Sequence, residues 1–221
     1  MKKLASGLVA ALLLMGISMA ATLAVFGYIL GKRSESQRAH NQALRQRARE
    51  LQLRSVTDGL TGAYSHAYLQ EMLSIEIDRA RRHMRPLSLL IMDIDDFKRI
   101  NDTHGHLFGD KVLEELTETI NMNIRQEDVL GRYGGEEFLV IMPGAEAAAA
   151  LKVGERVCRA VARAAIIDKQ GAPGGSRVQV TLSVGVSTFA GDSEVTPYAL
   201  IDEADKNLYR AKKEGKNRVC C

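Results

Sequence analysis

The sequence predicts an α/β protein, specifically an α+β sandwich in which a central, mostly antiparallel sheet is flanked by helices. Residues 87–94 are apolar on both faces, which is typical of a central strand covered on each side. Residues 128–133 and 137–142 surround a short Gly- and Glu-containing turn, which indicates a β-hairpin. Helical patterns separate these strands without strict βαβ repetition, so we expect the hairpin beside the 87–94 strand.

The chain begins with an apolar segment that contains no charged residue from position 4 to position 30 and has two basic residues on either side. At about 1.5 Å per helical residue, this segment can cross a hydrocarbon core of roughly 30 Å. A cleaved signal peptide is the alternative, because Ser18-Met19-Ala20 has suitable small residues, but signal cores usually span only about 7–15 residues. We therefore predict a single-pass transmembrane anchor at residues 1–31.

The distribution of basic residues predicts the orientation of that anchor. Seven Lys and Arg residues lie between positions 32 and 54, against two before the apolar segment. By the positive-inside rule, the anchor lies in the inner (cell) membrane with the C-terminal part in the cytoplasm. The three cysteines, Cys158, Cys220 and Cys221, form no disulfide framework, and we expect the last two to lie at a frayed end.

Residues 32–55 read as a juxtamembrane helical linker, rich in Arg, Gln, Ala and Leu and without Gly or Pro. Leu44, Ala48, Leu51 and Ser55 lie on one helical face, which is one possible short parallel coiled-coil seam, although the segment is brief and rich in Arg. A solvated stalk attracted to anionic lipid is the alternative. Either structure connects the membrane to a globular domain at residues 56–221.

Within that domain, turn residues at 56–62 precede a helix that Ser65 caps. Pro86 ends that helix, and Pro197 begins the last one, which Gly215 ends. The remaining boundaries follow from apolar periodicity and from Gly and Pro. We expect helices at 66–84, 97–101, 111–123, 147–167 and 197–213, strands at 87–94, 128–133, 137–142 and 177–188, and loops at 102–110 and 171–175.

The hairpin turn carries the chemistry. Gly134 and Gly135 are expected to supply positive φ for a two-residue turn and to let a ligand lie against the main chain. Glu136 and Glu137 follow them, and Asp93 ends the neighbouring strand. An ordinary solvated turn is the alternative for the hairpin alone.

Three carboxylates at adjoining strand ends are the hard oxygen ligands that Mg²⁺ prefers. A pair of Mg²⁺ ions, or of Mn²⁺ ions, can clamp the attacking and leaving oxygens of a phosphoryl transfer. Lys98, one helical turn beyond Asp93, can neutralise charge on the phosphates. A solvated acidic loop is the alternative, and the second acid pair on the hairpin makes it less favoured.

Four stretches resemble, in order and spacing, the motifs of the GGDEF family of diguanylate cyclases. They are residues 58–62, 93–102, 105–110 and 132–138, joined by Tyr209-Arg210-Ala211-Lys212 near the end. The resemblance covers about residues 56–219. It implies a fold similar to nucleotidyl-cyclase and polymerase-palm domains. It also implies a homodimer that joins two GTP into cyclic di-GMP, each 3′-hydroxyl attacking the partner's α-phosphate with release of pyrophosphate.

The resemblance also implies roles for single residues. Asp93, the Ile94 carbonyl and Glu136 would hold Mg²⁺; Glu136 would accept the proton of the 3′-hydroxyl, and Glu137 would support the metals. The substrate-binding residues would be Asn101 and Asp110 at the guanine, Gly134 and Gly135 in the turn, and Lys98, Lys212 and Lys216 at the phosphates.

Two stretches depart from the family pattern. Residues 63–66, Ala-Tyr-Ser-His, stand where the family usually has Leu-x-Asn-Arg. Lys216 stands where the family usually has arginine, which keeps the charge but loses the bidentate geometry.

A product-inhibition site is also implied. Arg125 and Asp128 occupy the places of the family's Arg-x-x-Asp motif, and Arg156 lies on the following helix. An Arg fork can pair with a phosphate while Asp addresses guanine. A surface ion pair is the alternative.

Two rival functions remain at this point: a silent domain that binds GTP or cyclic di-GMP, and a purely structural membrane scaffold. The intact carboxylates disfavour both. Nucleic-acid binding is disfavoured because the basic excess lies beside the membrane segment. His66, His83, His104 and His106 have no metal-ligand spacing, and we expect His106 to be structural.

Overall fold

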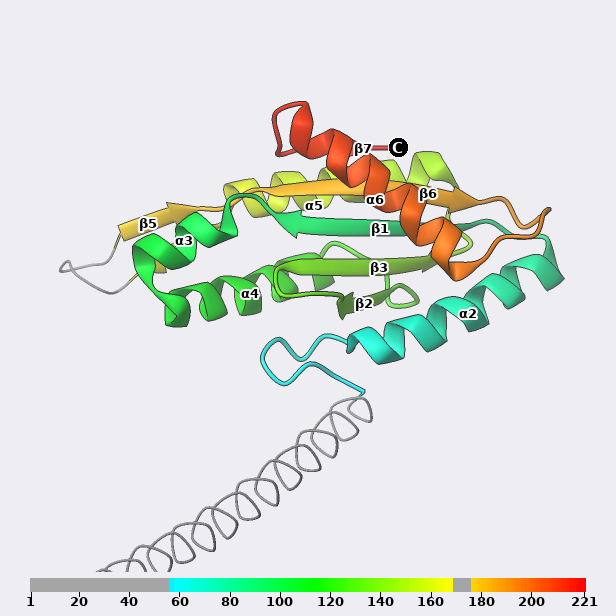
Figure 1. Ribbon diagram of the computed structural model, residues 1–221, viewed down its shortest axis with the longest axis horizontal. Coiled ribbons are helices and arrows are strands. Elements are labelled where there is room, and N and C mark those ends of the chain that lie inside the picture. The colour runs from blue at the N-terminus through cyan, green and yellow to red at the C-terminus, as the bar shows by residue number, and fades with distance from the viewer. Residues whose placement is uncertain (1–55, 169–175) are drawn as a thin grey trace, which may run out of the picture. The chain divides into compact units, whose positions relative to one another are not determined.

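The computed structural model describes residues 56–168 and 176–221 (Figure 1). The predicted anchor at 1–31, the linker at 32–55 and the 171–175 loop lie outside these ranges. Within them, no helix has the length and apolar character that crossing a membrane requires. The elements are α2 (His66–His83), β1 (Leu87–Ile94), α3 (Phe97–His104), α4 (His106–Asn121), β2 (Val129–Arg132), β3 (Glu137–Pro143), α5 (Ala147–Arg163), β4 (Ala165–Asp168), β5 (Ser176–Gln179), β6 (Leu182–Phe189), α6 (Pro197–Lys213) and β7 (Val219–Cys220).

The main sheet has the strand order β2-β3-β1-β6-β7, and every pair is antiparallel except β6–β7. Strand β1 is central, and all eight of its residues are buried. Its alternate side chains enter two separate cores, Leu90 and Met92 facing α3, α4 and α5, and Leu89 and Ile91 facing α2 and α6. The predicted α+β sandwich, with the hairpin beside β1, is confirmed.

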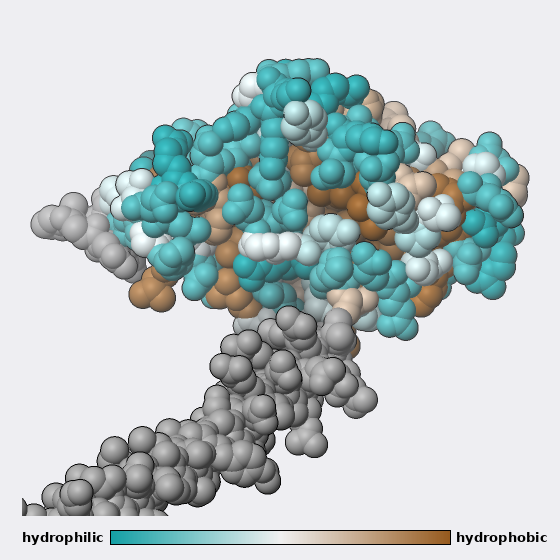
Figure 2. Space-filling model, in the orientation of Figure 1, coloured by the Kyte–Doolittle hydropathy of each residue, from teal (hydrophilic) through white to brown (hydrophobic). Residues whose placement is uncertain are grey.

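Helix α6 crosses the sheet unusually closely, because β6 has a glycine at the contact. A Cβ on Gly185 would lie 2.0 Å from the Ala204 carbonyl oxygen and 2.3 Å from the Leu208 nitrogen. This approach places the C-terminal half of α6, including Lys212, over the end of β1. Figure 2 shows the face of the domain on which α6 lies, where hydrophilic residues predominate and apolar residues are visible mainly between them.

The expected loop at 102–110 is wrong. Helix α3 continues to His104 and α4 begins at His106, so that Gly105, with φ of 82°, is the single residue between them. The buried residues Phe97, Ile100, Phe108 and Val112 recur at helical spacing on both sides of this break. Apolar packing therefore outweighs the Asp, Thr, His and Gly composition that suggested a loop.

Three predictions in the C-terminal half also need correction. Helix α5 ends at Arg163, and residues 165–168 form β4, which pairs with β5 in a separate antiparallel sheet. The expected strand at 177–188 is therefore two strands, β5 and β6, in different sheets. Cys220 is not at a frayed end: it lies in β7, paired with Gly185, and is 8% exposed. A two-residue strand is too short to leave a periodic pattern.

Candidate active site

The acidic residues meet where β1 ends and the β2–β3 hairpin turns. Asp93 is directly opposite Glu137 in the β1–β3 register. The Ile94 N–H donates to the Glu136 carbonyl oxygen at 3.4 Å, which ties the hairpin turn to the strand end. Asp93 is buried, whereas Glu136 and Glu137 are partly exposed. The predicted convergence of the three acids is thus present.

The hairpin turn differs from the two-residue turn expected. The Tyr133 and Gly134 N–H groups both donate to the Glu137 carbonyl oxygen, at 2.8 and 3.2 Å, so three residues, 134–136, form the turn. Neither glycine in it adopts positive φ. A Cβ on Gly134 would lie 2.5 Å from Glu137 Oε2, so a larger residue there would displace the Glu137 carboxylate, while Gly135 faces open space.

Arg132 ties the hairpin turn to Asp58 through side-chain hydrogen bonds. Its Nε and Nη2 donate to the Gly135 carbonyl oxygen at 3.2 and 2.7 Å, and its Nη1 donates to Asp58 Oδ1 at 3.1 Å. Thr61 donates to the same Asp58 oxygen from its N–H at 2.9 Å and its hydroxyl at 2.8 Å. We name these four residues, Asp58, Thr61, Arg132 and Gly135, the turn clamp.

Sequence reasoning missed the clamp, although Asp58 followed by Thr61 is a local signal for an Asp-initiated turn. Burial pushes the pKa of Asp58 upward, but the hydrogen bonds from Thr61 and Arg132 outweigh it and hold that pKa below its ordinary value. The Asp58 carboxylate is therefore stabilised in its charged form.

The acids at the strand end show the opposite shift. Burial raises the pKa of Asp93, Glu136 and Glu137, and the charge of Asp93 raises the pKa of both glutamates further. Lys212 opposes these shifts, since its Nζ lies 2.8 Å from Asp93 Oδ2. Three carboxylates that repel one another at a strand end favour the binding of a cation.

The donor set fits Mg²⁺ in the form that binds phosphate substrates. Among residues 56–168 and 176–221, no three His, Cys, Asp or Glu side chains are grouped closely enough to hold a metal by themselves. Mg²⁺ needs only one or two carboxylates, because waters and substrate phosphates complete its octahedron. Asp93, Glu136 and the Ile94 main chain meet that requirement.

The two predicted guanine positions lie on neighbouring helices. Asn101 is on α3 and Asp110 is on α4, and the sharp bend at Gly105 brings the two helices together. Asn101 packs over Gly109, where a Cβ would lie 1.9 Å from its Oδ1. Lys98 is exposed one turn before Asn101 on α3.

The loop after α6 returns to the same region through Asp95. This buried carboxylate accepts hydrogen bonds from Ser183 Oγ at 2.7 Å, from Thr181 Oγ1 at 2.7 Å and from the Asn217 N–H at 3.0 Å. Lys216 Nζ lies 2.7 Å from Asp96 Oδ1. Asp95 is therefore structural, and it fixes the loop that carries Lys216 near the acids.

The three product-site residues surround one turn after α4. Asp128 Oδ2 accepts the Arg125 N–H at 2.8 Å, and Arg156 donates to the Asn123 carbonyl oxygen from Nε at 3.2 Å and Nη2 at 2.6 Å. The buried Asp128 Oδ1 has no hydrogen-bond partner, and burial raises the pKa of this carboxyl. A buried acceptor left unpaired is costly, which favours a ligand that donates to it.

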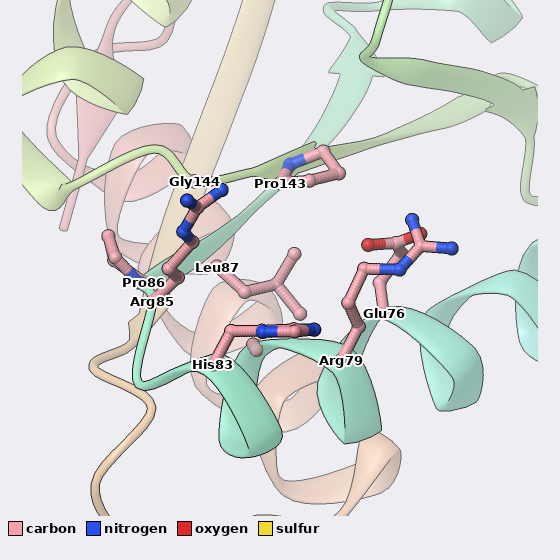
Figure 3. Close-up of a pocket in the computed structure, with 9 residues that line it drawn as sticks. Glu76, Arg79, His83, Arg85, Pro86, Leu87, Pro143 and Gly144 are labelled. Atoms are coloured by element: carbon pink, nitrogen blue, oxygen red, sulfur yellow. The ribbon is translucent and has the colours of Figure 1, made fainter.

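A cavity of about 360 Å³ lies elsewhere, between the end of α2 and the start of β1 (Figure 3). Glu76, Arg79, His83 and Arg85 line it, and Arg79 Nη1 lies 2.7 Å from Glu76 Oε1. Strand β1 separates it from Asp93 by about 20 Å, at roughly 3.3 Å per residue. It is therefore not part of the acid site.

Comparisons with known proteins show the family to which the chain belongs. The family model described as diguanylate cyclase, GGDEF domain, matches residues 55–218. The response regulator PleD of Caulobacter vibrioides is 43% identical over 165 residues, which are 75% of this chain and 36% of PleD. The probable diguanylate cyclase DgcC of Escherichia coli K12 is 40% identical over 177 residues, 80% of this chain and 46% of DgcC. The chain thus spans less than half the length of these two relatives.

Solved structures show the same fold. The GGDEF domain of DgcB from Caulobacter crescentus, in complex with c-di-GMP, superposes with a TM-score of 0.69 at 28% identity, covering 75% of this chain and 95% of that one. The active GGEEF domain of a diguanylate cyclase from Vibrio cholerae superposes with a TM-score of 0.63 at 30% identity, covering 71% and 95%. The match of the family model over residues 55–218, together with these relatives and this shared fold, places the chain in the GGDEF family of diguanylate cyclases.

Proposed function

We propose that this protein is a diguanylate cyclase that condenses two GTP into cyclic di-GMP and two pyrophosphates. The observation that carries the proposal is the convergence of Asp93, Glu136 and Glu137 at the end of β1. The similarity to the probable diguanylate cyclase DgcC supports it, as does the similarity to the active GGEEF domain from Vibrio cholerae, since this chain has Gly-Gly-Glu-Glu-Phe at residues 134–138.

Asp93, Glu136 and the Ile94 carbonyl would hold Mg²⁺, or Mn²⁺, with Glu137 in support. Two bound ions per site would supply positive charge that stabilises the attacking and leaving oxygens. Glu136 would accept the proton of the 3′-hydroxyl, since a carboxylate positioned beside a reacting hydroxyl can act as a general base. The positive charges of Lys98, Lys212 and Lys216 neutralise the phosphates.

Base recognition falls to Asn101 and Asp110. A carboxylate accepts from both the N1–H and the N2–H of guanine, and an amide can donate and accept beside it. Each chain holds one GTP, so a homodimer is required to bring a 3′-hydroxyl to the α-phosphate of the second nucleotide. Gly134 and Gly135 leave the turn open to the substrate phosphates.

Product inhibition completes the proposal. Cyclic di-GMP would donate from a guanine edge to the Asp128 carboxylate, while Arg125 and Arg156 pair with its phosphates. The protein would be anchored by residues 1–31 in the inner membrane, with residues 32–55 leading to the catalytic domain in the cytoplasm. The apolar segment and the basic residues after it support this placement.

The test uses the full 221-residue chain, purified in detergent and supplied with GTP and Mg²⁺. Chromatography should show cyclic di-GMP and pyrophosphate in a ratio of one to two. Removing a general base costs about 10²–10⁴ in rate, so Glu136→Gln should nearly abolish turnover while fluorescent GTP still binds.

Glu118→Gln is the matched control, because it removes the same charge from an exposed position on α4 and should keep full activity. Binding of GTP without any product by the wild type would instead support the silent-domain alternative. Equal turnover by wild type and Glu136→Gln would disprove the metal and base assignment.

A further inference from the structure

Strand β4 is tied to the corner between α3 and α4 by two neighbouring residues. His104 Nδ1 lies 2.8 Å from Asp168 Oδ2, and Lys111 Nζ donates to the Ile167 carbonyl oxygen at 2.9 Å. The Asp168 side chain is 7% exposed and the His104 side chain 23% exposed, so the first contact is largely shielded from water. Figure 1 shows the β4–β5 sheet at the end of the domain beside α3.

The two ties are adjacent to the two guanine positions. His104 is the last residue of α3, one turn after Asn101, and the Gly105 N–H donates to the Asn101 carbonyl oxygen at 2.9 Å. Lys111 follows Asp110 directly in α4. The angle between Asn101 and Asp110 is therefore set at a one-residue bend whose two sides are both held by β4.

Nothing else described at this bend supplies an equivalent polar tie. Gly105 has φ of 82° and no Cβ contact within 4 Å, so the bend has no side chain of its own to stiffen it. His104 also packs on Phe108, with ring centroids 5.0 Å apart, but a ring contact fixes direction less strictly than a hydrogen bond to a buried carboxylate.

We propose that His104 and Asp168 are positioning residues for guanine recognition, and that the β4–β5 sheet braces the α3–α4 corner in the geometry that distinguishes guanine from other purines. The inference rests on the proposed function, because it assumes that Asn101 and Asp110 bind the base. Neither His104 nor Asp168 needs to touch the nucleotide.

Loosening this corner should reduce the preference for guanine without reducing the rate of the reaction. When the corner is loosened, Asp110 can still reach one donor of the base but not two at once, so the advantage of guanine over hypoxanthine, which lacks the N2 amino group, declines. Mutations that act through such contacts typically change affinity several-fold. The acids at β1 and the hairpin lie on other elements, so the rate at saturating substrate is retained.

The experiment compares four forms of the full chain: wild type, His104→Leu, His104→Asn and Ile77→Val. Asparagine keeps a nitrogen donor near the position of Nδ1, whereas leucine keeps only the bulk. Ile77 is buried on α2, remote from the corner, so Ile77→Val controls for a general loss of stability. Binding of 3′-deoxy-GTP and 3′-deoxy-ITP, which lack the attacking hydroxyl, is measured by calorimetry with Mg²⁺.

We expect His104→Leu to weaken binding of 3′-deoxy-GTP and to reduce its preference over 3′-deoxy-ITP, each by about fivefold, with kcat for GTP within about twofold of wild type. His104→Asn should keep the wild-type preference, as should Ile77→Val. If His104→Leu does not fold, Lys111→Met, which removes the exposed second tie, should change the same preference in the same direction.

An unchanged preference in His104→Leu and Lys111→Met would overturn the inference while leaving the proposed function intact. A preference lowered equally by Ile77→Val would also overturn it, since the effect would then follow stability. If the wild type binds neither nucleotide, the proposed function and this inference fall together.

Discussion

Replacing Arg132 tests whether the turn clamp is needed to keep Glu136 in place. Arg132→Ala removes three hydrogen bonds, two to the Gly135 carbonyl oxygen and one to Asp58. Gly135 is the residue before Glu136, so the clamp is one peptide unit away from the proposed base. We expect the variant to lose both stability and turnover, with the loss of turnover being the larger.

The stability loss follows from the exposure of each bond. The Arg132 and Asp58 side chains are 17% and 26% exposed. A hydrogen bond between charged groups contributes about 1.5–3 kcal/mol, and partial exposure favours the lower end of that range. Gly135 is exposed, so water can replace Arg132 there and the loss is about 0.5–1 kcal/mol. The total, about 2–2.5 kcal/mol, lowers Tm by roughly 4–10 °C for a domain of this size.

The rate loss depends on geometry. A misplacement of about 1 Å at a reacting group can cost about 10²-fold in rate. Arg132→Lys keeps the charge but loses the fork, because an ammonium cannot hold Asp58 and Gly135 in the same planar arrangement. We therefore expect Arg132→Lys to recover part of the Tm but little of the kcat.

Circular dichroism gives Tm, and pyrophosphate release at saturating GTP gives kcat. Arg159→Ala is the control, because Arg159 forms an exposed ion pair with Glu155 at 3.4 Å and its loss should cost less than about 1 kcal/mol. A full kcat in Arg132→Ala, whatever its Tm, would refute the idea that the clamp positions Glu136.

Acid provides a second test of the clamp. The pKa of Asp58 is lower in the folded chain than in the unfolded chain, so its contribution to stability is present above the unfolded value, about 3.9, and is lost as pH falls through the folded value. The Tm difference between wild type and Arg132→Ala should therefore shrink below about pH 4. A difference that stays constant there would mean that the Asp58 carboxylate is not the partner that matters.

Three further predictions concern the acidic residues at the end of β1, the recognition of guanine and the inhibition by cyclic di-GMP. Asp93→Asn should raise Tm in the absence of Mg²⁺, because the pKa of Asp93 is raised in the folded chain and its charged form therefore destabilises that chain above this pKa. Mg²⁺ should raise the Tm of the wild type more than the Tm of the variant. Differential scanning fluorimetry measures both effects. Gly109→Ala should raise the KM for GTP about tenfold in steady-state kinetics, because the new Cβ displaces Asn101; an unchanged KM would remove Asn101 from base recognition. Arg125→Ala should keep activity and weaken inhibition by added cyclic di-GMP about tenfold or more, and an identical inhibition curve would exclude this site.

The sequence was sufficient for features that depend on local pattern. The six apolar residues among the eight of β1 predicted a central strand, and the hairpin around Gly134 predicted where its acids would meet Asp93. Both inferences need only strand periodicity and a short turn, which are encoded within a few residues. The pairing of β3 with β1 was expected from the order of the elements, which is not a strict βαβ repetition.

Features set by distant contacts were not predictable in the same way. The clamp joins Arg132 to Asp58, which is 74 residues away. Strands β4 and β5 are four residues each and are stabilised by pairing with one another. Neither has an apolar alternation strong enough to distinguish it from the helix or strand next to it in the sequence. The φ of Gly134 was mispredicted because the turn has three residues, 134–136, a length set by the hydrogen bonds of Tyr133 and Gly134 to Glu137.

Asp93 and Asp95 show why residue type alone does not define a site. They are two positions apart on and after the same strand, and both are buried. Asp95 has three hydrogen-bond donors, from Ser183, Thr181 and Asn217, which satisfy its carboxylate and make it a structural anchor. Asp93 has Lys212 on one side and two glutamates on the other, so its charge is only partly compensated. The carboxylate that the fold satisfies supports the loop, and the one that it leaves under-compensated is the proposed ligand of the metal.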